Sequence, residues 1–175
     1  MYNDGTEAEI RVIPADTKER VRGAKALCEE YARSLGFDLD FQDFDEEMAS
    51  FPGSYSPPAG RLLVAVVGER MVGCVALRKL GPDVCEMKRL YVKPKFRRRR
   101  IGLALAQAVI AEARRIGYAR MRLDAIRSMT EAVALYGSLG FVEIPSYRDN
   151  PIDGAMFMEL ILEPGNGQGR KNETC

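Results

Sequence analysis

The stretch MKRLYVKPKFRRRRIGLALAQAVI, Met87–Ile110, places a proline and four consecutive arginines between two apolar-rich runs. Val84–Val92 predicts a strand, which Pro94 limits because proline cannot donate to a ladder of hydrogen bonds. Apolar residues recur at three- and four-residue steps in Ile101–Ile116, which predicts an amphipathic helix. The stretch therefore predicts a strand, a short basic turn and a helix, in that order.

A strand, a turn and a helix start together form an arrangement that can bind an anion. The first turn of a helix leaves N–H groups unpaired, and the helix dipole adds partial positive charge there. Gly102 and Ala104 lack bulk, so a phosphate could approach the main chain closely. The arginines add charge that suits a pyrophosphate. A solvated basic face and a nucleic-acid patch remain open alternatives, while a Walker loop and a dinucleotide fingerprint are both absent from the sequence.

The remaining elements follow from apolar periodicity and turn signals. Predicted strands are Glu9–Ile13, Arg61–Val67, Met71–Leu80, Arg120–Ile126, Phe141–Ile144 and Ala155–Leu162. Predicted helices are Thr17–Leu35, a short one near Asp43–Ser50 within the loop Phe37–Gly60, and one from Ser128 to about Leu139. Ser128 and Glu131 fit a capping box at the start of that last helix. The order predicts one mixed α/β layered domain over residues 1–162 and a disordered tail over 163–175.

Composition excludes several classes of chemistry. The net charge of the 175 residues is +1, so the arginine run is a local feature. The absence of histidine excludes Ser-His-Asp and Cys-His catalysis, which both need an imidazole base. The four cysteines form no C-x-x-C pair, so we expect no metal site and read them as buried residues in a reducing compartment. The first residues are polar, and no apolar run approaches the ~20 residues of a membrane span, which predicts a cytoplasmic protein without a membrane partner.

Two motifs of this chain resemble the GNAT superfamily of acyl-CoA-dependent N-acetyltransferases. They are EMKRLYVKPKFRRRRIGLALAQAVI and AVALYGSLGF. The second matches the family pattern A-x-x-L-Y-x-x-L-G-F fully, at Ala132, Leu135, Tyr136, Leu139, Gly140 and Phe141. The resemblance implies a GNAT-like acyltransferase fold, with a mixed, mainly antiparallel central sheet flanked by helices.

The first motif contains the phosphate loop of the family, Q/R-x-x-G-x-G/A, in one of two registers. The register that begins at Arg97 keeps the family's spacing from LYV to the loop, and we prefer it. It places Arg100 where the family usually has glycine, and Gly102 at the last position. The other register begins at Arg99 and fits the pattern literally, ending at Ala104. The family often has asparagine at the position of Met129.

The resemblance implies acetyl-CoA as co-substrate and a small-molecule or peptide amine as acceptor. The amine would attack the thioester directly within a ternary complex, since the cysteines lack an activating histidine. The implied binding residues are Leu90, Tyr91 and Val92 for the pantetheine arm, and Arg97, Arg98, Arg99, Arg100, Ile101, Gly102, Leu103 and Ala104 for the phosphates.

The resemblance also places two catalytic candidates. Glu86 is the candidate base that accepts the proton of the amine through a water, with Asp124 and an acid of the Asp38–Glu47 loop as rivals. The non-catalytic alternative for Glu86 is a charged residue on a solvated strand face. Tyr136 is the candidate acid for the departing thiolate, because a phenol is neutral at pH 7. Its alternative is a core aromatic.

The acceptor itself stays open among an amino acid, a polyamine, an antibiotic and a peptide N-terminus. Six carboxylates of the acidic loop either attract a cationic amine or form a solubilising helix face: Asp38, Asp40, Asp43, Asp45, Glu46 and Glu47. Arg148 and Asp149 lie in a later loop on the expected acceptor side. The apolar last strand is a candidate homodimer interface.

Two other functions compete with catalysis. A non-catalytic acyl-CoA-binding module would need the phosphate loop but neither Glu86 nor Tyr136. A nucleic-acid-binding module would use Lys88, Arg89, Lys93, Lys95 and Arg97–Arg100, although the near-neutral charge and few adjacent aromatics argue against a nucleic-acid partner.

Overall fold

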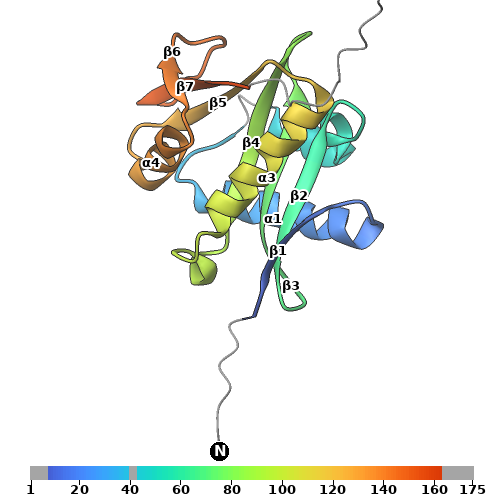
Figure 1. Cartoon of the computed structure of the whole chain (residues 1–175). Coiled ribbons are helices and arrows are strands. Elements are labelled where there is room, and N and C mark those ends of the chain that lie inside the picture. The colour runs from blue at the N-terminus through green and yellow to red at the C-terminus, as the bar shows by residue number, and fades with distance from the viewer. Residues whose placement is uncertain (1–7, 40–42, 163–175) are drawn as a thin grey trace, which may run out of the picture.

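The computed structural model describes residues 8–39 and 43–162, and its centre is a seven-stranded sheet in the order β1-β2-β3-β4-β5-β7-β6 (Figure 1). The strands are β1 (Ile10–Pro14), β2 (Arg61–Val67), β3 (Arg70–Lys79), β4 (Val84–Val92), β5 (Arg120–Ile126), β6 (Val142–Ile144) and β7 (Ala155–Ile161). The helices are α1 (Lys18–Ser34), α2 (Phe44–Ser50), α3 (Ile101–Ile116) and α4 (Thr130–Ser138), with short 3-10 turns at Gly53–Tyr55 and Pro94–Phe96. Only β4 and β5 pair in parallel, so the mixed, mainly antiparallel sheet is confirmed.

Helices cover both faces of the sheet, as the apolar periodicities predict. On one face α3 buries Leu105, Val109 and Ala113 against the sheet in a core that includes Met87 of β4. On the other face α1 and α2 form a second core, to which Leu27 contributes (Figure 1). The central strands therefore lie between two apolar layers, and a polar side chain on them must find a partner inside the protein.

The sheet is split between β4 and β5. The two strands pair only from Val84↔Arg120 to Glu86↔Arg122, although both continue beyond these residues. On its other edge β4 contains a β-bulge, because the pairing with β3 passes from Ala76↔Lys88 to Cys74↔Tyr91 and leaves two residues of β4 opposite one of β3. Bulges bend a strand and leave a residue out of the ladder. The bend occurs where β4 parts from β5.

One detail of the predicted elements is wrong. The last helix begins after Met129, whose carbonyl accepts the bond from Val133 N at 3.1 Å, and no side chain caps it. Ser128 instead lies in a tight turn that Met129 N closes on Ile126 O at 2.9 Å, so the capping box does not form. The last strand, β7, pairs with both β5 and β6 and buries most of its apolar residues. The homodimer remains a prediction. The predicted tail, 163–175, lies outside the described residues.

We expect the close approach at Gly60, just before β2, to limit substitution there. A Cβ at Gly60 would lie 2.6 Å from the carbonyl carbon of Tyr55 and in contact with Ser54 O, and neither backbone atom can move aside cheaply. Gly60→Ala should lower the free energy of unfolding by about 1–3 kcal/mol. The control Gly137→Ala, in the last turn of α4 with no atom within 4 Å of the added Cβ, should instead raise it by up to about 1 kcal/mol. Denaturant unfolding measures both, and a Gly60→Ala protein as stable as the wild type would contradict the packing argument.

Candidate active site

A cavity lies at the split between β4 and β5. It begins beyond Glu86↔Arg122, the last pair that joins the two strands. The residues that matter for its chemistry are Lys88 and Leu90 of β4, Asp124 of β5, Tyr136 of α4, Tyr31 of α1 and Asn150 of the loop before β7. Apolar residues that follow α1, among them Phe37 and Leu39, form another wall. Charged and polar side chains therefore line the cavity together with apolar ones.

The structure brings some of the predicted site residues together and separates others. Leu90, Tyr136 and the rival base Asp124 line the same cavity, and so does Met129. Glu86 does not line it, because its carboxylate lies behind Lys88 with no exposed surface. Residues 97–104 lie past the end of β4, in the loop that leads into α3 and in the first turn of that helix.

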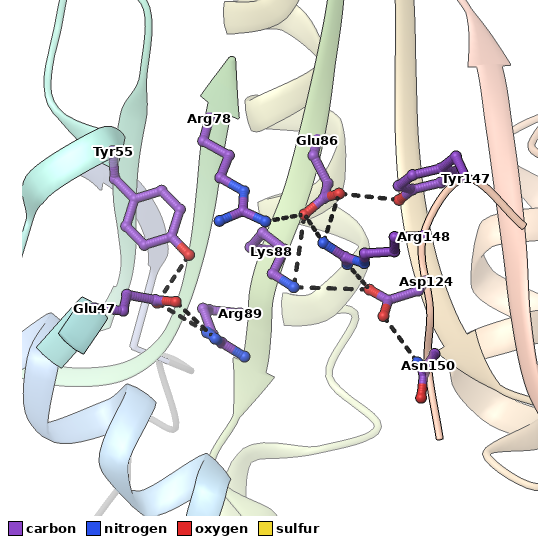
Figure 2. A network of polar contacts seen from close by, with 10 residues as sticks. All are labelled: Glu47, Tyr55, Arg78, Glu86, Lys88, Arg89, Asp124, Tyr147, Arg148 and Asn150. Atoms are coloured by element: carbon purple, nitrogen blue, oxygen red, sulfur yellow. Dashed lines mark hydrogen bonds and ion pairs between the residues drawn. The ribbon is translucent and has the colours of Figure 1, made fainter. Parts of the chain in front are cut away.

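Glu86 is the centre of a buried polar network (Figure 2). Its carboxylate accepts hydrogen bonds from Arg78 Nη2 at 3.0 Å and from the Tyr147 hydroxyl at 3.0 Å. Arg148 Nη1 lies 3.2 Å from Oε2, and Lys88 Nζ lies 3.6 Å from Oε1. Three cations thus surround one fully buried carboxylate, and the interpretation of Glu86 as a charge on a solvated face is wrong.

Asp124 extends this network from β5. It accepts hydrogen bonds from Arg148 Nη2 at 2.8 Å and from Asn150 Nδ2 at 3.1 Å, and Lys88 Nζ lies 3.8 Å away. Burial alone would raise the pKa of Asp124, but the charges of Lys88 and Arg148 outweigh it and hold the pKa below its usual range. The carboxylate is therefore ionised at neutral pH.

Lys88 connects the two carboxylates. Only 4% of its side chain is exposed. Burial lowers its pKa more strongly than the charges of Asp124 and Glu86 raise it, and the resulting pKa is about 8. A lysine with this pKa exchanges protons near physiological pH, unlike a surface lysine.

Tyr136 points its phenol into the cavity from α4. Its ring packs edge-on against Phe141, with 5.8 Å between the ring centroids. Among the described residues, its hydroxyl has no hydrogen-bond partner. Burial raises the pKa of Tyr136 above its usual value, so the group is a neutral phenol that can donate a proton.

The loop before α3 has an unusual backbone. Arg98 and Arg100 both have positive φ, at 63° and 59°. The first i→i−4 bond of α3 runs from Ala104 N to Arg100 O, so the amides of residues 101–103 come before the helical ladder. Alternating backbone conformations of this kind can turn successive N–H groups toward one anion.

Residues 24–141 match the sequence model of the Acetyltransferase (GNAT) family. The chain belongs to the GNAT family. It is 41% identical over 140 residues to an uncharacterized N-acetyltransferase from Schizosaccharomyces pombe, an alignment that covers 79% of this chain and 86% of the relative. It is 36% identical over 137 residues to another from Escherichia coli, covering 77% of this chain and 81% of that one.

Solved GNAT structures share the fold. An acetyltransferase of the GNAT family from Staphylococcus aureus superposes with a TM-score of 0.73 at 19% identity, over 89% of this chain and 100% of that one. PaiA N-acetyltransferase from Thermoplasma acidophilum, in complex with coenzyme A, superposes with a TM-score of 0.64 at 16% identity, over 87% and 99%. These structures share the fold, and membership of the family makes the chain an acyltransferase.

The backbone of this GNAT chain bears on the register of its phosphate loop. In the register that begins at Arg97, Arg100 occupies the position where the family pattern usually has glycine, and its φ of 59° is a conformation that favours glycine. Gly102 is an ordinary helical residue, and a Cβ there would meet no atom closer than 3.8 Å. The register that begins at Arg97 therefore aligns the usual glycine of the pattern with a residue of positive φ, whereas the register that begins at Arg99 aligns it with a helical residue.

The basic stretch does not form one continuous surface. Lys88 and Arg89 have side chains that are only 4% and 3% exposed, and both form ion pairs inside the protein. Arg97 Nε donates to Val92 O at 3.1 Å, so its side chain turns back onto β4. Several of the cations that a nucleic-acid-binding module would use are therefore buried or bonded within the protein.

Sequence reasoning missed the residues that complete the network. From the sequence, Lys88 is a candidate only in the nucleic-acid alternative, although its two-residue spacing from Glu86 within one strand indicates a shared face. Tyr147 and Asn150 enter from the loop between β6 and β7, which lies near the site because β7 pairs with β5. No local signal in that loop predicts this long-range contact.

The carboxylates of the acidic loop differ in their surroundings. Glu47 of α2 holds Arg89 with two contacts, to Nε at 3.0 Å and to Nη2 at 2.7 Å, and accepts a hydrogen bond from Tyr55 at 2.8 Å (Figure 2). Its charge is therefore used inside the protein and is unavailable to an amine. Asp43, Asp45 and Glu46 are exposed, which leaves both predicted roles open for them, and Asp40 lies outside the described residues.

We expect Glu47 to stabilise the fold in a pH-dependent way. Burial would raise its pKa, but the hydrogen bond and charge of Arg89 outweigh it and lower the pKa. A carboxylate with a lowered folded pKa contributes stability above its unfolded pKa, ~4.3, and loses it as the pH falls through the folded value. Glu47→Ala should lower the free energy of unfolding by about 3 kcal/mol at pH 7.

Denaturant unfolding between pH 7 and pH 3 measures this difference. It should shrink as the pH falls below the usual glutamate range. The control Glu46→Ala, which removes an exposed neighbouring carboxylate, should change stability by less than about 0.5 kcal/mol. A constant difference across the pH series would contradict the electrostatic origin.

Proposed function

We propose that this GNAT chain transfers an acetyl group from acetyl-CoA to a primary amine by direct attack within a ternary complex. The observation that carries the proposal is the split between β4 and β5. Its cavity is lined by a phenol that has no hydrogen-bond partner in residues 8–39 and 43–162, and by a buried ionised carboxylate. This arrangement can hold a thioester beside an amine, and its side chains can accept and donate the protons that the transfer requires.

The acyl-CoA would bind along β4 and at the loop before α3. Tyr91 and Val92 of β4 pair with β3 on one side only, and residues 90–92 do not pair with β5, so this main-chain edge suits the amide-containing pantetheine arm. The pyrophosphate would meet the amides of residues 98–103. Arg98 and Arg100 are exposed beside these amides and have no partner within the described part of the chain. The coenzyme A complex of PaiA, a protein of the same fold, supports this choice of co-substrate.

The transfer forms a C–N bond and breaks a C–S bond. The acceptor ammonium must first lose a proton, because its nitrogen otherwise has no lone pair. The neutral amine attacks the carbonyl carbon, and the thiolate leaves as the tetrahedral adduct collapses. Tyr136 would give its proton to that sulfur, which its unpartnered and neutral phenol permits.

The base in this proposal is Glu86, acting through an intermediary. Its carboxylate has no surface of its own, so a proton can reach it only through a neighbouring group. Asp124 faces the cavity directly and remains the rival base, while its negative charge also suits attraction of a cationic acceptor. The apolar wall at Phe37 and Leu39 would contact the body of that acceptor.

Tyr136→Phe tests the proposal at its proton donor. Thiol release over a panel of amines should slow at least ~10-fold, because the leaving thiolate loses its acid. Affinity for acetyl-CoA, measured by calorimetry, should change less than twofold. The control Tyr118→Phe removes a hydroxyl that bonds Ala59 O outside the cavity and should leave the rate unchanged.

Three outcomes would overturn the proposal in different ways. Thiol release that is unaffected by Tyr136→Phe would remove Tyr136 from the reaction. CoA binding without turnover of any amine would indicate an acyl-CoA-binding module. Oligonucleotide binding without CoA affinity would indicate a nucleic-acid-binding module.

Glu86→Gln tests the base. The amide keeps the size of the side chain and can still bond Tyr147, but it cannot take up a proton. The rate should fall most at low pH and approach the wild-type rate at high pH, where the acceptor is already a free amine. A reduction of equal size at every pH would show that Glu86 only positions its neighbours.

A further inference from the structure

The proposed chemistry lacks a group that both faces the cavity and passes a proton to Glu86. Lys88 lies on the same face of β4 as Glu86, two residues further along the strand. It lines the cavity, and its Nζ lies 3.6 Å from Glu86 Oε1 and 3.8 Å from Asp124 Oδ1. Lys88 is therefore the cavity residue through which Glu86 can communicate with a bound acceptor.

The fold fixes Lys88 at this place. Lys88 pairs with Ala76 as the last regular residue of β4 before the bulge, and the following residue, Arg89, has a φ of 58°. It also lies just beyond Glu86↔Arg122, the last pair between β4 and β5. Its side chain consequently enters the split where the two strands part.

We propose that Lys88 is the catalytic group that removes the proton from the acceptor ammonium, and that Glu86 and Asp124 stabilise the charge that Lys88 acquires. This inference rests on the proposed amine acetylation. The neutral Lys88 amine takes one proton from the acceptor, whose lone pair then attacks the thioester carbon. The acceptor nitrogen loses a second proton as the adduct collapses, and that proton replaces the one that Tyr136 gives to the thiolate. Lys88 finally passes its proton by way of Glu86, the base of the proposed reaction, to solvent, so the protons balance.

The electrostatic surroundings of Lys88 suit this role. Its own strand presents Glu86 and Arg89, β5 presents Asp124, and the loop before β7 presents Arg148. Tyr31 of α1 and Tyr136 of α4 line the same cavity as neutral phenols. Burial and the two arginines oppose a charge on Lys88, while the two carboxylates favour it, and the pKa of about 8 is the result. A base with this pKa is partly neutral at physiological pH and still strong enough to deprotonate an ammonium group.

The alternative is that Lys88 serves only as the cation of a buried ion pair. Arginine would satisfy that role, because it keeps the positive charge and the length of the side chain. Arginine cannot act as the base, because its guanidinium stays protonated. Lys88→Arg therefore separates the two roles, and Lys88→Met adds a variant without charge. Lys79→Arg, at the exposed end of β3, is the matched control.

The experiment measures kcat/KM against pH with an alkylamine acceptor, whose own pKa is near that of a free lysine, ~10.4. The wild-type value should rise to a plateau above about pH 8. Lys88→Arg should be ~10²-fold slower at pH 7.5 and should recover toward pH 10, as free amine accumulates. Its acetyl-CoA affinity should stay within twofold of the wild type, as should every property of Lys79→Arg. A Lys88→Arg enzyme with the wild-type rate and pH profile would overturn the assignment.

A second measurement does not depend on turnover. In protein labelled with ¹⁵N-lysine, the Nζ resonance missing from Lys88→Arg identifies Lys88, and its titration should have a midpoint near 8. A midpoint above 10 would overturn the inference even in an active enzyme. If the wild type binds acetyl-CoA but acetylates no amine, the proposed function fails first, and the role of Lys88 fails with it.

Discussion

The positive φ of Arg89 is the constraint on which the site depends. A non-glycine residue in this conformation costs of order 1 kcal/mol, so something must hold it there. Contacts of the Arg89 side chain stabilise this backbone conformation. Glu47 binds the side chain with two contacts, and the ring centroid of Phe44 in α2 lies 5.1 Å from its guanidinium carbon. Helix α2 thus stabilises the bulge that bends β4 at the split. The geometry of the cavity and the position of an element outside it are therefore coupled.

The buried charges around Glu86 orient the residues of the site more than they stabilise the fold. Desolvation of a carboxylate and several cations costs roughly what their attraction returns, so such clusters seldom add net stability. What the cluster does provide is orientation: Arg148 contacts both Glu86 and Asp124, and so connects the β6–β7 loop to the two strands that part. The strands pair through only three residues there. The side-chain network extends their connection beyond the end of the ladder.

Much of the fold could be predicted because its signals are local. Apolar periodicity located α3, and proline ended β4, to within a residue or so of the structure. The bulge at Arg89 could not be predicted, because it depends on the register between β3 and β4 and on a contact from α2. For the same reason the sequence suggested no role for Lys88 beyond the nucleic-acid alternative and none for Tyr147. The motifs located the region of the site, but pairing between distant strands determined which side chains meet there.

The arginines of the loop before α3 illustrate how a family position can change its residue and keep its geometry. Glycine would adopt the φ of Arg100 without strain, whereas arginine retains it at a cost of about 1 kcal/mol. Arg98 adopts the same conformation two residues earlier, so the strain is repeated within one short loop. Backbone strain of this kind persists where the surrounding structure imposes it, and it is concentrated at ligand sites. An arginine here also adds a guanidinium that glycine lacks, directly beside amides that precede the helical ladder. In the proposed acyl-CoA complex, arginine at this position would therefore keep a backbone conformation suited to an anion and add positive charge.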